Sequence, residues 1–99
     1  MKIKEKPNLI LEEKLNSITT QLENLQKLKS NSLKDYESKY EQANVLLEET
    51  NEIIQKIKTY KNQYIIKFYR LQERIDALMY ATEIFIDLMN NPLIETDEY

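Results

Sequence analysis

Residues 64–89 read YIIKFYRLQERIDALMYATEIFIDLM, and this stretch decides the fold of the chain. Apolar residues recur in it at alternating spacings of three and four, which is the repeat of one face of a helix. The repeat is Tyr64, Phe68, Leu71, Ile75, Leu78, Thr82, Phe85 and Met89. We therefore expect a long amphipathic helix that packs this face against other helices.

The same repeat extends backward to Leu33 without a fault in its spacing, and its earlier members include Leu47, Ile54 and Ile57. A sustained repeat of this kind is typical of helices that associate lengthwise. We therefore interpret its apolar residues as an oligomer seam, called the seam below. The seam consists of Leu47, Ile54, Ile57, Tyr64, Phe68, Leu71, Ile75, Leu78, Phe85 and Met89.

An earlier repeat, from Leu11 to Leu25, has a different phase. A stutter within one continuous helix would explain this slip, and so would a turn at Ser30-Asn31-Ser32. We favour the turn, because Ser32 suits the N-cap of a new helix with Asp35 at its third position. A second break is predicted at residues 59–62, where the chain either bends into a third helix or continues straight to another partner.

The opening stretch also carries a second set of apolar residues on the face opposite the seam. We call this set the outer stripe, and it consists of Ile66, Tyr69, Tyr80 and Ile84. A helix with a single neighbour needs only one apolar face. The outer stripe is therefore covered by the chain itself or identical copies, or else by a different protein.

The two ends of the helical region carry terminating signals. Asn8 suits an N-cap after Pro7, and Asn90-Asn91-Pro92 suits a helix end, where asparagine tolerates the left-handed conformation and proline cannot continue. We expect a flexible tail over residues 1–7, one helical domain over 8–91, and an acidic C-terminal tail over 92–99. That tail is either a frayed end or a short peptide motif.

Composition argues against catalysis. The 99 residues include no histidine, cysteine or glycine, so the commonest general base, thiol nucleophile and phosphate-binding loops are absent. We expect no enzyme activity, no metal and no cofactor. The net charge of −3 has no concentrated basic face for nucleic acid, and no apolar run is long enough to insert in a membrane. No secretory signal is evident, and we expect an intracellular, cytoplasmic protein.

The sequence thus predicts an all-α protein whose long heptad-patterned helices form a hairpin, three-helix bundle or coiled coil that is oligomeric. The expected function is that of a non-catalytic coiled-coil subunit or adaptor, which joins a homo- or hetero-oligomer through helix packing with protein partners. The alternative is a small helical chaperone or inhibitor that masks an amphipathic helix of one client protein, as in secretion or viral systems.

Overall fold

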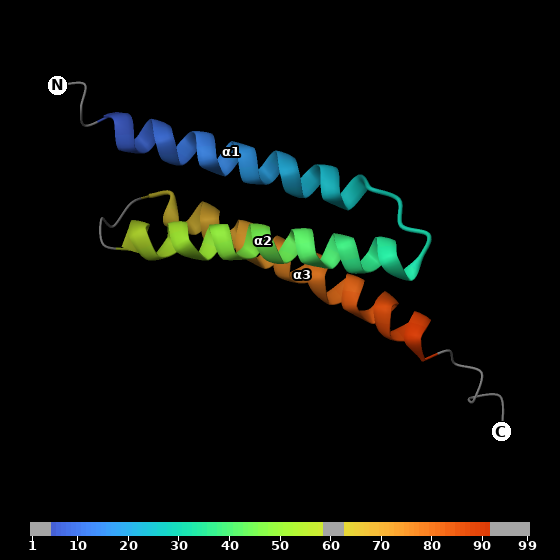
Figure 1. Ribbon diagram of the computed structural model, residues 1–99. Coiled ribbons are helices and arrows are strands. Elements are labelled where there is room, and N and C mark those ends of the chain that lie inside the picture. The colour runs from blue at the N-terminus through green and yellow to red at the C-terminus, as the bar shows by residue number, and fades with distance from the viewer. Residues whose placement is uncertain (1–4, 59–62, 92–99) are drawn as a thin grey trace.

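The computed structural model describes residues 5–58 and 63–91, which form three helices and, over those residues, no strand. The helices are α1 (Glu5–Lys27), α2 (Leu33–Lys58) and α3 (Ile65–Asn90). Figure 1 shows that the chain reverses twice, so that α2 runs antiparallel to both α1 and α3. The predicted all-α class and the packing of three helices into a bundle are confirmed.

The first reversal is the turn predicted around Ser30-Asn31-Ser32. The Ser32 hydroxyl oxygen accepts a hydrogen bond from the Asp35 backbone N–H at 3.2 Å. In return, the Asp35 carboxylate accepts one from the Asn31 backbone N–H, also at 3.2 Å. The first bond satisfies a donor that the start of a helix leaves unpaired, and the second ties Asn31 to the first turn of α2. Together they fix where α2 begins.

The second reversal brings α3 back along α2. Helix α2 ends at Lys58 and α3 begins at Ile65, so of the two alternatives at this break the bend into a third helix is confirmed. Residues 59–62, including Lys61 at a repeat position, lie outside the described residues.

Two details at the ends of the helices differ from expectation. Asn8 is not an N-cap, because α1 begins at Glu5; Pro7 therefore lies in the first turn, where its missing N–H breaks no helical bond. Asn91 follows α3 as expected, but with φ −129° it is not left-handed. Its N–H still donates to the Asp87 carbonyl oxygen at 2.8 Å, which is how the last turn is closed. Residues 92–99, including Pro92 and the predicted acidic tail, lie outside the described residues.

The core lies where the three helices meet. Its buried apolar side chains come from α1 (Ile18, Leu22, Leu25), α2 (Ala43, Leu46, Ile54, Ile57), and α3 with the residue before it (Tyr64, Phe68, Leu71, Ile75). Each large apolar side chain buried in this way contributes about 1.5–3 kcal/mol relative to an exposed one. Two threonines in the same repeat, Thr50 and Thr82, are also buried, and their hydroxyls donate to the carbonyls of Leu46 and Leu78 at 2.7 Å.

Most of the seam therefore lies inside this chain. Ile54, Ile57, Tyr64, Phe68, Leu71 and Ile75 are core residues, and Leu47 and Leu78 pack against them. These side chains are covered without a second chain. Phe85 and Met89 are exposed instead, because the last turns of α3 diverge from α2 (Figure 1).

The bundle is elongated. Its radius of gyration is 17.7 Å and its extents are 70 × 22 × 14 Å, whereas a compact domain of this length has a radius of gyration of about 13 Å. Three long helices packed in this way leave much of their surface exposed. Two of these exposed surfaces are apolar.

Candidate helix-binding surfaces

The first apolar surface is the outer stripe of α3. All four of its side chains are exposed: Ile66 by 59 %, Tyr69 by 36 %, Tyr80 by 68 % and Ile84 by 42 %. The opposite face of the same helix carries Phe68 and Ile75, which are fully buried. The described part of the chain thus uses one face of α3 for its core and leaves the other uncovered.

The outer stripe spans five helical turns as two pairs of large apolar side chains, and the positions between the pairs hold Glu73 and Ala77. Ala77 is exposed, and Leu88 extends the stripe by one further turn. Burying one large apolar side chain contributes about 1.5–3 kcal/mol, so a partner that covered the stripe would gain several kcal/mol. Contiguous exposed patches of this kind mark interaction surfaces.

The edge of the outer stripe is basic in its N-terminal half. Arg70 and Arg74 are the only arginines of the chain, and both are exposed one turn apart on the same side of α3. Lys67 lies on this edge as well, with its ammonium 5.2 Å from the centre of the Tyr64 ring. Arginine binds carboxylates with two parallel hydrogen bonds, so this edge favours an acidic counterpart.

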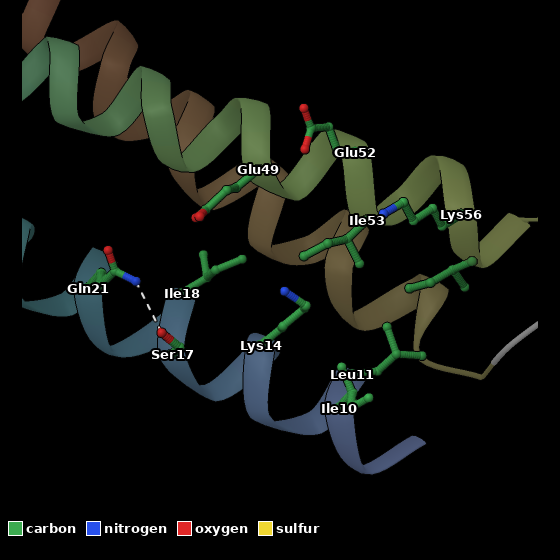
Figure 2. Close-up of a pocket in the computed structure, with 11 residues that line it drawn as sticks. Ile10, Leu11, Lys14, Ser17, Ile18, Gln21, Glu49, Glu52, Ile53 and Lys56 are labelled. Atoms are coloured by element: carbon green, nitrogen blue, oxygen red, sulfur yellow. Dashed lines mark hydrogen bonds between the residues drawn. The ribbon is translucent and has the colours of Figure 1, made fainter. Parts of the chain in front are cut away.

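The second apolar surface is a groove between α1 and α2, with a volume of about 640 Å³. Its floor is formed by apolar side chains of both helices. Figure 2 shows Ile18 of α1 and Ile53 of α2 pointing toward each other across this space, with Leu11 further along α1. The groove exists because α1 and α2 meet only along their core-facing edges, and their next positions outward diverge.

The groove continues toward the turn that connects α1 to α2. A second hollow of about 400 Å³ shares Gln21 with the first and is lined by Leu25, Leu28, Val45 and Leu46. Leu28 and Val45 are exposed, and so is Ile10 at the other end of the groove. The apolar lining therefore extends from Ile10 of α1 to Leu28, which follows the last residue of that helix. Its helical part, from Ile10 to Lys27, is about 26 Å long.

The walls of the groove are polar and of unlike charge. Glu49 and Glu52 lie one turn apart on the α2 wall, whereas the α1 wall carries Lys14, followed by neutral Ser17 and Gln21. Glu49 and Lys14 extend into the space from opposite helices (Figure 2). The α2 wall also includes Lys56, at the end near Ile10.

Sequence reasoning identified the outer stripe but missed the groove. The groove depends on how far apart two helices lie, which a repeat does not specify. The available signal was the set of apolar residues just off the two repeats, namely Ile10, Leu28 and Val45.

Among the side chains of residues 9–58 and 63–91, no cluster of three or more acidic groups could hold a metal ion. Within the same ranges, no helix is long and apolar enough to cross a membrane.

No protein-family model, curated protein or solved structure matches this chain.

Proposed function

We propose that this protein is a non-catalytic helical subunit that binds a helix of a partner protein through the outer stripe of α3. One observation carries the proposal. Four large apolar side chains are exposed on a helix whose opposite face already fills the core of the chain.

The shape of the stripe favours a helical ligand. Its residues span positions 66 to 84, which is about 27 Å of straight helix, as one pair at each end of that length. A partner helix with apolar residues at the same spacing would interdigitate with them lengthwise. Tyr69 and Tyr80 suit such a contact because a tyrosine ring buries a large apolar area while its hydroxyl stays at the wet edge.

A chaperone or inhibitor of one client is the second candidate, and the completeness of the core favours it. Phe68, Ile75 and Ile57 are almost fully buried within a single chain, so the fold does not depend on a partner for these contacts. A chain that folds alone and presents an open apolar stripe can mask a client helix and later release it. An assembly subunit would keep its partner.

Site-specific photo-crosslinking in the cells that produce the protein tests the proposal. A benzophenone amino acid replaces Tyr80 of the outer stripe, and a matched control variant carries it at Glu23, which is exposed on α1 away from the groove. We expect crosslinks from position 80 to one amphipathic helical segment, because that face of α3 would contact a partner. Equal crosslinking from position 23, or none from position 80, would contradict the proposal.

The crosslinked segment then supplies a synthetic peptide for a binding assay. We expect the double substitution Tyr69→Ser and Tyr80→Ser to weaken binding of this peptide at least tenfold while the helical circular dichroism signal stays unchanged. Unfolding of the double variant would show that the stripe supports the fold instead. Stable co-purification of the partner would favour the subunit, and release during the life of the client would favour the chaperone.

A further inference from the structure

The geometry points to a second copy of this chain as an occupant of the groove between α1 and α2. In this arrangement the outer stripe of α3 from one copy lies in the groove of the next. The inference rests on the proposed function, since it names a partner for the same stripe. It follows from three matches between the two surfaces: length, apolar character and charge.

Length and apolar character agree. The lining of the groove extends from Ile10 of α1 to Leu28, which follows the last residue of α1, and the outer stripe extends from Ile66 to Ile84 of α3, so the two surfaces are similar in length. The groove lies between two neighbouring helices, where a further helix of a bundle would pack. A fourth helix placed there would cover the partly exposed Ile53, together with the exposed Leu28 and Val45.

The charges on the two surfaces determine the direction in which α3 would lie in the groove. Arg70 and Arg74 lie on one edge of the outer stripe, and Glu49 and Glu52 lie on the α2 wall of the groove. Each pair is spaced by about one helical turn, which allows two arginine–carboxylate pairs to form together. On the opposite edge of α3, Asp76 and Glu83 would face the α1 wall, which carries Lys14. For a right-handed helix seated with its stripe in the groove, this assignment of edges requires α3 to run parallel to the α2 of its neighbour.

The contact is head to tail. The outer stripe faces away from the core, whereas the groove lies between α1 and α2, so the two surfaces are different patches of one molecule. A contact between unlike patches leaves one groove and one stripe free at the ends of a pair. Further copies can therefore add, giving either a closed ring or an open chain of subunits.

Charge reversal tests the inference with the full-length protein. The groove variant carries Glu49→Lys and Glu52→Lys, and the stripe variant carries Arg70→Glu and Arg74→Glu. All four side chains are exposed, so neither variant disturbs the core. Light scattering during size exclusion gives the mass of each variant alone, of wild type, and of the two variants mixed.

We expect wild type at high concentration and low salt to show at least twice the 11.9 kDa mass of one chain. Each variant alone places like charges on both surfaces and is expected at 11.9 kDa. The mixture is expected to recover the higher mass, because the lysines of one variant face the glutamates of the other. Raising the ionic strength should lower the mass of wild type and of the mixture.

Three outcomes would overturn the inference: a monomeric wild type, association that survives both reversals, or a mixture that stays monomeric. A monomeric wild type whose position 80 still crosslinks to another protein would overturn self-association alone and leave the proposed function standing. If position 80 did not crosslink to any protein while copies of the chain still associated through other residues, both the proposed function and the inference of self-association through the groove would be contradicted. As a matched control, Glu12→Lys with Glu23→Lys reverses two exposed charges of α1 away from the groove lining, and should leave the mass unchanged.

Discussion

Lys39 of α2 donates a hydrogen bond from its ammonium group to the backbone carbonyl oxygen of Leu28, at 2.9 Å. The lysine is buried, and the carbonyl follows directly after the last residue of α1. A cation at the C-terminal end of a helix also interacts favourably with the helix dipole. This contact joins the end of α1 to the first turns of α2 across the turn between them.

Substitution of Lys39 by Met should therefore destabilise the fold. Methionine keeps most of the apolar stem but leaves the Leu28 carbonyl without its buried donor, and we expect a loss of about 1–3 kcal/mol in the free energy of unfolding. Urea denaturation followed by circular dichroism measures this loss. The matched control is Lys34→Met, at an exposed position of the same helix, where a change within about 0.5 kcal/mol is expected.

Removing the cap of α2 should have a smaller effect. We expect Ser32→Ala to lower the free energy of unfolding by about 1 kcal/mol, because the Asp35 N–H loses the hydroxyl that accepts its hydrogen bond. Ser38→Ala is the control, since its hydroxyl bonds only to exposed Gln42 within the helix. Thermal unfolding would contradict the assigned cap if both variants had the melting temperature of wild type.

The sequence was sufficient for the fold class and for the turn at Ser30-Asn31-Ser32. A repeat specifies which face of each helix is apolar, and a slip in its phase marks where one helix stops. It does not specify how many chains share the apolar core. That is why residues interpreted as a seam between chains, such as Phe68 and Ile75, lie in the core of one chain.

Other features depend on distances that no repeat contains. Phe85 and Met89 continue the seam in sequence, but the divergence of α3 from α2 leaves both exposed. The groove also results from the spacing of α1 and α2. Asn8 and Pro7 were misleading because proline is compatible with the whole first turn of a helix and does not fix its first residue.

Adjacent residues of α3 should respond to substitution in opposite ways. Phe68 is fully buried, and Phe68→Leu removes part of a packed ring, with an expected loss of about 1–1.5 kcal/mol in the free energy of unfolding. Tyr69, on the outer stripe, should tolerate Tyr69→Ser within about 0.5 kcal/mol. Guanidinium denaturation of the two variants provides the comparison. Equal destabilisation would mean that the outer stripe belongs to the core.

The exposed end of the seam retains one specific contact. The rings of Tyr36 and Phe85 stack with centroids 5.1 Å apart and an interplanar angle of 15°, joining the start of α2 to the end of α3. We expect a double-mutant cycle of Tyr36→Ala and Phe85→Ala to give a coupling energy of about 0.5–1 kcal/mol. Met89→Ala, one turn later and similarly exposed, replaces Phe85→Ala in the control cycle and should show no coupling with Tyr36.

Helix α1 should open before the α2–α3 pair does. It contributes three buried apolar side chains, Ile18, Leu22 and Leu25, and a groove separates its outer edge from α2. Helices with few buried contacts open locally at a lower free energy than the whole fold. We therefore expect amide hydrogens near Leu22 to exchange at a lower opening free energy than those near Ile75, by native-state hydrogen exchange at increasing urea.

Substitutions in the two regions then separate local from global opening. Leu22→Ala should accelerate exchange in all three helices, because the packing that it removes is lost both when α1 opens alone and when the whole bundle unfolds. Ile75→Val removes a methyl group from the fully buried centre of α3. It should accelerate exchange in α2 and α3 but not in α1, because the packing of α3 against α2 is kept when α1 opens alone. If wild-type amides in α1 and α3 exchanged with the same free energy and the same urea dependence, the bundle would open as one unit and α1 would not be the less stable element.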